Sequence, residues 1–245
     1  MNNEVVSIIM PAYNASATID ESINSVLQQD FQHWHLYIVD DSSSDDTFSR
    51  AQSYDDERIT VLSNVNNLGV AESRNKAIKI CKGKYIAFLD SDDIWHKNKL
   101  TSQIKVLSEG WDLVCSNFST FTNEKEVVSI RRSPENIDYG MLLKSNYIGN
   151  LTGIYNSEKY GKFYQKKSGH EDYIMWLDII SKTKQAYCIQ KCLARYRLQN
   201  KSLSSNKARA IIWQWKIYRN HQNISFFNSI KYMFFYFYNA ILKRT

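Results

Sequence analysis

Short apolar runs alternate with amphipathic segments through residues 5–93, and this alternation limits the chain to few folds. The apolar runs predict strands over residues 5–10, 35–39, 58–62 and 84–89. Helical periodicity predicts helices over residues 18–29 and 69–81, with a short helix after residue 42. Strands and helices that alternate at this spacing form a mostly parallel sheet with helices on both faces. The sequence therefore predicts an α/β fold.

Two local signals mark the ends of the predicted helices. Thr18 and Glu21 have the spacing of a capping box, in which each side chain bonds a backbone N–H at the start of a helix. Gly83 follows the helix that begins at Gly69, and we expect it to close that helix in the usual C-terminal position.

Polar side chains gather where three of the four strands end. Tyr13 and Asn14 follow the first strand, Asp40 and Asp41 follow the second, and Asp90–Asp93 follows the fourth. In open parallel sheets, ligands bind beyond the carboxyl ends of the strands. We therefore expect these clusters to meet in one ligand site.

The segment Asp90–Asp93 carries three carboxylates within four positions. Such a run repels itself unless it is neutralised, so its complement is a divalent cation with oxygen ligands, Mg²⁺ or Mn²⁺. Strand alternation would place Asp90 and Asp92 on one side, toward phosphate oxygens, and turn Asp93 away. The alternative is that the carboxylates cap a helix that begins near residue 94.

Asp40 and Asp41 also have two interpretations. Carboxylates at strand ends bind ribose hydroxyls or base N–H groups in nucleotide-binding folds. The alternative is that they cap the turn over Ser42–Asp46. Tyr13, in Pro11–Asn14, offers a ring and a hydroxyl beside the same nucleotide.

The second part of the chain is less regular. Residues 112–121 and 126–130 predict a hairpin, residues 139–145 and 171–181 predict helices, and residues 185–196 predict a strand. We divide the chain into a catalytic domain, residues 1–205, and a basic, aromatic helical region, residues 206–245. Within the domain, residues 1–93 form the nucleotide-binding half and residues 94–205 the acceptor-binding half.

Charge is distributed unevenly along the chain. Residues 1–178 hold 18 Lys and Arg and all 25 Asp and Glu, a net charge of −7, whereas residues 179–245 hold 13 Lys and Arg and no acidic residue, a net charge of +13. A wholly basic end favours an anionic partner. Charge alone leaves nucleic acid, anionic lipid and a phosphate-bearing substrate open.

Two C-terminal helices are predicted, over residues 207–221 and 225–243. The second contains a seventeen-residue aromatic segment, 226–242, interrupted by Asn228, Lys231 and Asn239. A membrane span needs about 20 apolar residues, so the segment is a poor span. Aromatics mixed with Lys and Arg are typical of helices at an anionic membrane surface. The alternative is that the aromatics pack on the domain or on a second subunit.

Five motifs in order resemble glycosyltransferase family 2, the inverting enzymes of the GT-A fold, and together they extend over about residues 5–197. The motifs are Ser7-Ile-Ile-Met-Pro-Ala-Tyr-Asn14, Ile38-Val-Asp-Asp-Ser-Ser-Ser-Asp-Asp-Thr47, Asn67-Leu-Gly-Val-Ala-Glu-Ser-Arg-Asn75, Tyr85-Ile-Ala-Phe-Leu-Asp-Ser-Asp-Asp93 and His170-Glu-Asp-Tyr173. The resemblance implies the Rossmann-like GT-A fold, with the amphipathic C-terminal helices added to it.

The resemblance also implies roles for individual residues. Asp90 and Asp92 match the family's Asp-x-Asp element, which holds Mn²⁺ or Mg²⁺ on the diphosphate, and Asp172 matches the catalytic base. For Glu171 and Asp172 the alternative is ordinary acidic charge at the start of a helix. The residues expected to bind the nucleotide-sugar are Pro11, Ala12, Tyr13, Asn14, Asp40, Asp41, Gly69, Arg74, Asp90, Ser91, Arg195 and Arg197.

The region around the base provides further candidates. His170, Glu171 and Trp176 are expected to shape the acceptor pocket, although His170 and Trp176 could equally be packing. Arg195 and Arg197 alternate on one face of a strand and would suit phosphate oxygens, or else form a solvated basic strand. The family often has a histidine shortly after this point, where this chain has Gln199 and Asn200, which weakens the transfer of that role.

The resemblance implies an inverting hexosyl- or N-acetylhexosaminyltransferase. The expected donor is a UDP-sugar, and the expected acceptor is a lipid-linked oligosaccharide or related glycan of O-antigen, capsule or lipopolysaccharide. The N-terminus lacks the basic start and apolar run of a signal peptide, so we expect a cytoplasmic protein, peripheral on the inner face of the plasma membrane. The alternatives are a nucleotidyltransferase, disfavoured because no Gly- or Lys-rich phosphate loop follows the first strand, and a nucleic-acid-binding protein. No nucleic-acid module is recognisable, and we expect no nucleic acid to bind.

Overall fold

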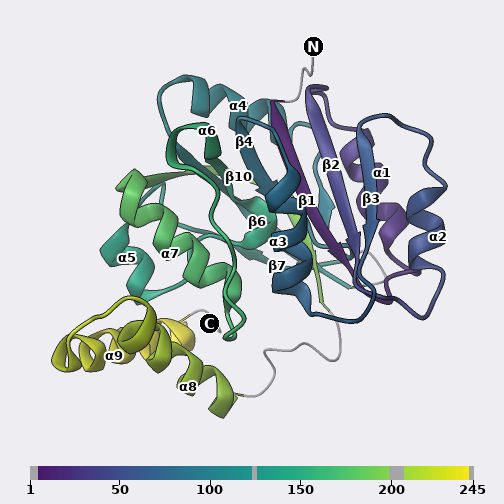
Figure 1. Cartoon of the computed structure of the whole chain (residues 1–245). Helices are drawn as coiled ribbons and strands as arrows, with labels where there is room; N and C mark the ends of the chain where they lie inside the picture. Colours follow the sequence, from purple (N-terminus) through teal and green to yellow (C-terminus); the bar gives the residue numbers. More distant parts are fainter. Residues whose placement is uncertain (1–4, 123–125, 199–206, 243–245) are drawn as a thin grey trace.

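A mixed β-sheet with helices on both faces forms the body of the protein (Figure 1). The computed structural model describes residues 5–122, 126–198 and 207–242. The strands are β1 (Val6–Ala12), β2 (Trp34–Asp40), β3 (Ile59–Ser63), β4 (Tyr85–Phe88), β5 (Ile94–Trp95), β6 (Leu113–Phe121), β7 (Val127–Arg131), β8 (Asn136–Asp138), β9 (Ile154–Asn156) and β10 (Gln185–Arg197). The helices are α1 (Ile19–Leu27), α2 (Thr47–Gln52), α3 (Val70–Ile80), α4 (Lys99–Ser108), α5 (Tyr139–Lys144), η1 (Asn150–Thr152), α6 (Ser157–Tyr160), α7 (Glu171–Thr183), α8 (Lys207–Lys216), η3 (Ile217–His221) and α9 (Phe226–Leu242).

The first half of the sheet is parallel, as predicted. Its order is β3-β2-β1-β4, and β1 pairs in parallel with both β2 and β4. This register brings Ala12 beside Asp40, so the chain leaves β1 and β2 at the same edge. β4 ends at that edge as well, just before Asp90. The polar clusters therefore meet, as we expected.

The second half of the sheet is mixed. β9 joins it antiparallel to both β4 and β6, and β6 pairs in parallel with the long β10. The predicted hairpin is confirmed as the antiparallel pair β6 and β7. The helices predicted over residues 139–145 and 171–181 and the strand over 185–196 correspond to α5, α7 and β10. This half contributes the wall that faces the polar clusters.

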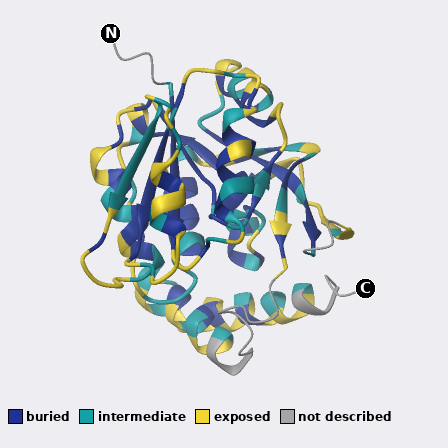
Figure 2. Cartoon of the chain, turned by 90° about the vertical axis from the view of Figure 1, so that its right-hand side faces the viewer, coloured by how far each residue is buried: buried dark blue, intermediate teal, exposed yellow. Residues whose placement is uncertain are grey.

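Strand alternation divides the core into two layers. On β1, Ile8 and Met10 face a layer with α1 and α4, whereas Ile9 faces a layer with α3, α5 and α7. All three side chains are fully buried. The blue strands between helices in Figure 2 show the same division. Because both faces are covered, the strands read as continuous apolar runs rather than as alternating ones.

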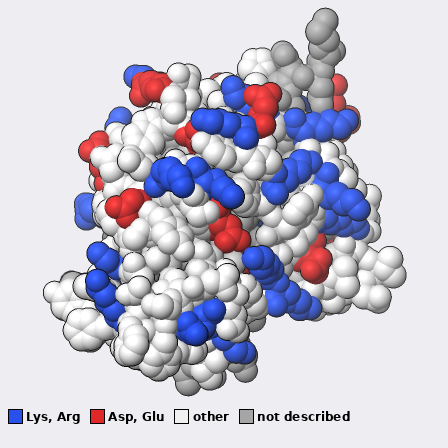
Figure 3. Space-filling view, turned by 60° about the vertical axis from the view of Figure 1, so that its left-hand side comes forward, with Lys and Arg blue, Asp and Glu red and all other residues white. Residues whose placement is uncertain are grey.

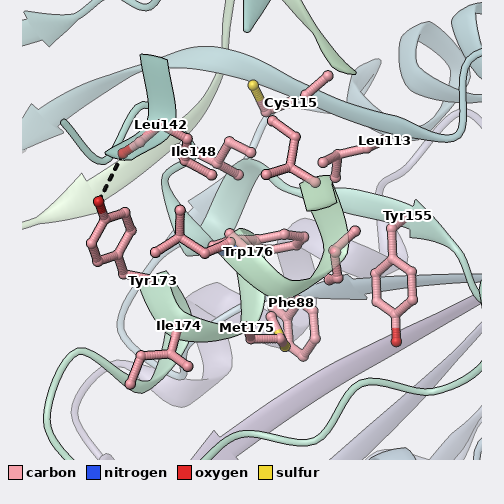
Figure 4. Packing of buried hydrophobic residues seen from close by; sticks show 14 of the residues in the cluster. Phe88, Leu113, Cys115, Leu142, Ile148, Tyr155, Tyr173, Ile174, Met175 and Trp176 are labelled. Atoms are coloured by element: carbon pink, nitrogen blue, oxygen red, sulfur yellow. Dashed lines mark hydrogen bonds between the residues drawn. The ribbon is translucent and has the colours of Figure 1, made fainter. Parts of the chain in front are cut away.

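Trp176 lies in the second of these layers, which corrects its expected role in the acceptor pocket. Its side chain is 0% exposed, and its ring meets Phe88 and Tyr155 edge to face. Figure 4 shows the indole enclosed between neighbouring elements of the core. Gly153 is required beside it, because a Cβ at that position would lie 2.4 Å from the indole. Trp176 therefore anchors α7 in the core.

Two expectations about helix ends are wrong. The Thr18 side chain makes no capping bond to α1, because its hydroxyl donates to the Ser91 carbonyl instead, at 2.9 Å. Gly83 does not close α3, which ends at Ile80 with Cys81 in an extended conformation. Gly83 is needed for another reason, since a Cβ there would lie 2.6 Å from the Ser7 nitrogen in β1. In both cases a contact distant in sequence replaces the local signal.

The C-terminal helices pack beneath α5 and α7 (Figure 1). Both predicted helices are present, the first as α8 with η3 and the second as α9. Ile217, Tyr218 and Met233 are buried in the same core layer as Trp176. In the described part of the chain, no helix is long and apolar enough to cross a membrane. The predicted domain boundary, between residues 205 and 206, lies outside the described residues.

Candidate active site

A cavity of about 660 Å³ opens at the carboxyl ends of β1, β2 and β4. Nine of the residues predicted to bind the nucleotide-sugar or its metal line this cavity: Pro11, Ala12, Tyr13, Asn14, Asp41, Gly69, Asp90, Ser91 and Asp92. Tyr13 is 52% exposed, so its ring is accessible to a ligand. We refer to this space as the donor cavity.

Asp41 organises one wall of the donor cavity. Its carboxylate accepts hydrogen bonds from the Asn64 side chain and from the backbone N–H groups of Leu68 and Gly69, at 2.8 to 2.9 Å. Burial raises the pKa of Asp41, but these hydrogen bonds outweigh it and lower the pKa below its ordinary value. Asp41 therefore stays ionised and fixes the loop before α3, where Gly69 adopts a φ of 93°.

Asp40 lies outside the lining of the donor cavity, which corrects its expected contact with the nucleotide. The side chain is 3% exposed and accepts the Ser43 backbone N–H at 3.1 Å. Of the two interpretations from the sequence, capping of the following turn describes Asp40. Asp41, in contrast, both caps a loop and lines the cavity.

The segment Asp90–Asp93 is a turn, because β4 already ends at Phe88. The argument from strand alternation is therefore wrong, and Asp93 is not turned away from Asp90, because both line the second cavity described below. Asp93 is 1% exposed and accepts the Arg197 backbone N–H. Burial, with the charges of Asp92 and Asp90, raises the pKa of Asp93 well above its ordinary value. The alternative of a helix from residue 94 is also wrong, since β5 begins there and α4 begins at Lys99.

Arg74 pairs with Asp90 at the boundary of the donor cavity. Their closest atoms, Arg74 Nη2 and Asp90 Oδ1, lie 2.5 Å apart, and Arg74 also donates to Gln165 Oε1 at 2.9 Å. The Arg74 side chain is buried, so its charge is poorly screened by water. Arg74 thus orients Asp90. Its charge borders the second cavity described below and not the donor cavity, where we expected Arg74 to contact the nucleotide-sugar.

A second cavity, of about 400 Å³, shares Asp90 with the donor cavity. We refer to it as the acceptor cavity. It is lined by Arg74, Asp90, Asp93, Phe118, Thr120, Arg131, Gly149, Asn150, Leu151, His170, Asp172, Tyr196 and Leu198. The predicted base therefore opens into a space that adjoins the predicted nucleotide site.

Asp172 lies in the first turn of α7, which begins at Glu171 after His170 in the left-handed conformation, with a φ of 54°. Burial raises the pKa of Asp172 above its ordinary value, and the charge of Asp90 adds to this. Arg74 and His170 oppose the shift without cancelling it. A carboxylate with a raised pKa is a stronger base than an ordinary aspartate, which suits proton abstraction.

Of the other residues predicted to bind the acceptor, His170 lines the acceptor cavity and Glu171 does not. His170 lines the acceptor cavity, and its ring meets that of Trp213 edge to face at 5.4 Å. Glu171 lies outside the lining, and its carboxylate accepts the Gly169 backbone N–H at 3.1 Å. Glu171 therefore stabilises the turn before α7.

Arg195 and Arg197, which we expected to contact phosphate, line neither the donor cavity nor the acceptor cavity. Both guanidinium groups lie over the Phe121 ring, at 4.4 and 4.5 Å. Arg197 is 5% exposed, donates to the Asp92 carbonyl and pairs with Glu21 at 2.7 Å. The residues of β10 and its end that do line the acceptor cavity are Tyr196 and Leu198, on the opposite face.

Several lining residues were not predicted from the sequence. Asn67 lines the donor cavity and lies in one of the quoted motifs, so that motif could have indicated it. Phe118, Thr120, Arg131 and Asn150 line the acceptor cavity and belong to no motif. A separate depression of about 390 Å³, bordered by residues 109–112 and 183–185, contains none of the predicted site residues.

Asp90 and Asp92, the carboxylates that we expected to hold a metal, both line the donor cavity. Across the described ranges, no group of three or more His, Cys, Asp or Glu side chains could hold a metal ion. A cation here would need oxygen ligands from a bound phosphate as well, which is how Mg²⁺ is usually held. Two aspartates at the edge of a cavity fit such a shared site.

Comparisons with known proteins agree with this geometry. Residues 7–164 match the family described as Glycosyl transferase family 2. The chain is 37% identical to the putative teichuronic acid biosynthesis glycosyltransferase TuaG of Bacillus subtilis, over 98% of this chain and 97% of that protein. It is 39% identical to WfgD of Escherichia coli, a UDP-Glc:α-D-GlcNAc-diphosphoundecaprenol β-1,3-glucosyltransferase, over 89% of this chain and 86% of that protein.

A solved structure shows the same fold. TarS from S. aureus, in complex with UDP-GlcNAc, superposes with a TM-score of 0.73 and 19% identity, covering 95% of this chain and 71% of that chain. The sheet, the two cavities and the family match lead to one conclusion: the chain belongs to glycosyltransferase family 2, and it is a glycosyltransferase of the GT-A fold.

Proposed function

We propose that this protein transfers a sugar, with inversion, from a UDP-sugar to a hydroxyl of a lipid-linked oligosaccharide or related cell-surface glycan. One observation carries the proposal: Asp90 lines both the donor cavity and the acceptor cavity, and Asp172 lines the acceptor cavity. A donor in the donor cavity and an acceptor in the acceptor cavity would meet at Asp90, beside the proposed base Asp172.

The reaction follows from that arrangement. Asp172 takes the proton of the acceptor hydroxyl, whose oxygen forms a bond to the anomeric carbon of the donor sugar. The bond from that carbon to the diphosphate oxygen breaks on the opposite face, and the nucleoside diphosphate leaves with the electron pair. A single displacement inverts the anomeric configuration. The buried guanidinium of Arg74 lies near this charge and stabilises it.

Asp90 and Asp92 would hold the divalent metal, Mn²⁺ or Mg²⁺, together with oxygens of the diphosphate. The metal would offset the charge that develops on the leaving diphosphate. The turn that carries both aspartates is held from two sides, by Ser22, which donates to the Asp93 carbonyl, and by Arg197, which donates to the Asp92 carbonyl. Its position is therefore fixed before any ligand binds.

The names of the relatives support the substrates. WfgD is named for a UDP-Glc donor and a diphosphoundecaprenol-linked acceptor, and the TarS structure contains UDP-GlcNAc. TuaG is named for the biosynthesis of a cell-surface polymer. These names favour a UDP-sugar and a lipid-linked acceptor for this chain as well, within O-antigen, capsule, lipopolysaccharide or a similar polymer.

We also propose that α9 holds the protein on the inner face of the plasma membrane. One side of α9 packs on the core through Met233, while the other exposes a band of large apolar side chains, which are Phe226, Phe227, Ile230, Phe234, Phe237 and Tyr238. In Figure 3 the lower part of the molecule is largely uncharged, with scattered basic groups. An aromatic band near basic residues suits an anionic lipid interface.

Calorimetric titration of UDP, with Mn²⁺ and then with EDTA, tests the donor site. We expect metal-dependent binding that weakens strongly in Asp92→Ala, while an exposed aspartate such as Asp46→Ala has no effect. Transfer from UDP-sugars to an alkyl-diphosphate glycoside then tests the reaction. If neither UDP nor another nucleoside diphosphate binds in the presence of metal, the proposal is wrong.

A further inference from the structure

Four residues that line the acceptor cavity have a buried polar side-chain atom without a partner among the described residues, and Asn150 differs from Arg74, Asp93 and His170 in having two such atoms. It is only 9% exposed, yet within the described chain neither its amide oxygen nor its amide nitrogen has a hydrogen-bond partner. Buried amides are nearly always paired, because an unpaired donor or acceptor loses its bonds to water without replacement. Asn150 lines the cavity, so a ligand that reaches the buried amide through a small rotation of the side chain would complete these bonds.

The backbone around Asn150 is held by buried side chains. Trp95 Nε1 donates to the Leu151 carbonyl at 2.8 Å, and Gln103 Nε2 donates to the Thr152 carbonyl at 2.7 Å. The Thr152 hydroxyl closes the turn by donating to the Gly149 carbonyl at 2.8 Å. This anchoring from behind fixes the segment, so the Asn150 amide has a defined position at the cavity wall.

Two aromatic rings line the same cavity as Asn150. Phe118 packs against the same turn so closely that a Cβ on Gly149 would lie 2.8 Å from its ring. The Tyr196 ring meets Phe118 at a centroid distance of 6.3 Å, and Tyr196 remains 37% exposed. Both rings line the acceptor cavity. The cavity thus combines an unpaired amide, which donates and accepts, with an apolar ring surface.

A pyranose has the complementary chemistry. Its hydroxyls both donate and accept hydrogen bonds, and its C–H groups form an apolar face that packs on aromatic rings. We propose that Asn150, Phe118 and Tyr196 form the subsite for the acceptor sugar, the one that carries the attacking hydroxyl. This inference rests on the proposed function and deepens it, because it assigns the residues that would present that hydroxyl to Asp172.

The experiment measures binding of acceptor analogues to protein loaded with UDP and Mn²⁺. The probes are decyl-diphosphate glycosides of GlcNAc, GalNAc, glucose and galactose, titrated by calorimetry. We expect at least one probe to bind and Asn150→Ala to weaken it about tenfold or more, the effect of losing hydrogen bonds to a buried group. Tyr196→Ala should also weaken binding, whereas Tyr196→Phe, which keeps the ring, should not.

Controls separate the possible failures. Asn24→Ala removes an exposed asparagine on α1 and should bind the probe like the wild type. UDP affinity and the melting temperature should be unchanged in Asn150→Ala, which distinguishes recognition from folding. Unchanged probe affinity in Asn150→Ala would overturn the subsite, as would a UDP-loaded wild type that binds none of the probes. Failure to bind any nucleoside diphosphate would instead overturn the proposed function.

Discussion

Asp172 shows how neighbouring residues set the chemistry of one carboxyl group. Burial and the charge of Asp90 raise its pKa, while Arg74 and His170 restrain the rise. If Asp172 is the base, as we propose, it must be deprotonated to accept a proton, so we expect activity to fall as pH decreases through this raised pKa. The acid limb of the rate profile therefore lies above the ordinary aspartate value of 3.8.

Replacing the base tests this role directly. Asp172→Asn keeps the size of the side chain but cannot take a proton, so we expect kcat to fall by about 10²-fold or more. The affinity for UDP should fall much less than kcat, because Asp172 does not line the donor cavity. A variant that retains most of its kcat would exclude Asp172 as the base.

Arg74 provides a second test, through pH rather than rate. Arg74→Met removes a charge that lowers the Asp172 pKa, so the acid limb of kcat/KM should move to higher pH. Arg50→Met is the matched control, because it breaks an exposed arginine–aspartate pair with Asp20 on the surface. The profile of this control should coincide with that of the wild type. A shift of the Arg74→Met profile to lower pH would contradict the assignment.

At the scale of elements, α7 is positioned by its buried side rather than by its cap. Trp176 fills a space between β4 and β9 that exists only because residue 153 is glycine. The first turn of the same helix carries Asp172 into the acceptor cavity. The packing of the indole therefore anchors the helix that carries Asp172, the proposed base.

Gly153→Ala should destabilise the fold, because its Cβ would overlap the Trp176 ring at 2.4 Å. We expect a loss of about 1–3 kcal/mol in the free energy of unfolding, measured in urea. In a Trp176→Phe background the smaller ring leaves room, so the same substitution should cost less. Equal costs in the two backgrounds would show that the two residues do not interact.

Local sequence patterns predicted where helices and strands lie better than they predicted which way the side chains on them face. Periodicity found β1, β2, β4 and α3 because their apolar spacing is a property of the chain itself. It could not predict which face of β10 meets the cavity, since alternation has two equivalent phases until β10 is placed beside β6. The Arg197–Glu21 pair joins residues 176 positions apart, and no local signal marks such a contact.

Of the candidate site, the donor cavity could be predicted from the sequence and most of the acceptor cavity could not. The donor cavity is built from strand ends and short loops, where sequence motifs and geometry coincide. The acceptor cavity is assembled from β6, β7, η1, α7 and β10, which come together only in the folded sheet. Asn150 is a candidate only because the fold buries its side chain. No local sequence pattern indicates that this asparagine is buried.

At the scale of the whole molecule, α9 packs on the core with one side and exposes an apolar band on the other. Met233 joins the core layer that contains Trp176, while Phe227 and Phe234 are 83% and 68% exposed on the other side. A helix fixed on one side and apolar on the other would orient the protein on a surface rather than merely attach it. Attachment would be reversible, at about 1 kcal/mol for each basic residue near an anionic leaflet.

Sedimentation with vesicles tests the band. The double variant Phe227→Asp, Phe234→Asp should lose most of its binding to vesicles that contain phosphatidylglycerol, because it removes apolar area and adds negative charge. Val65→Asp with Val128→Asp adds the same charge at exposed apolar positions elsewhere and should retain binding. A different result would contradict the membrane proposal: a wild type that does not bind vesicles but forms a dimer, with a double variant that is monomeric. The apolar band would then be a subunit interface.

Because Asp90 lines both cavities, we expect the proposed donor and acceptor sites to be thermodynamically coupled through one carboxylate. A cation bound at Asp90, as proposed, would lower the pKa of Asp172, since the Asp90 charge is one of the causes that raise it. By linkage, loss of the Asp172 proton must strengthen the binding of that cation by the same factor. Donor affinity should therefore increase with pH over the range in which Asp172 titrates, although Asp172 lies in the other cavity.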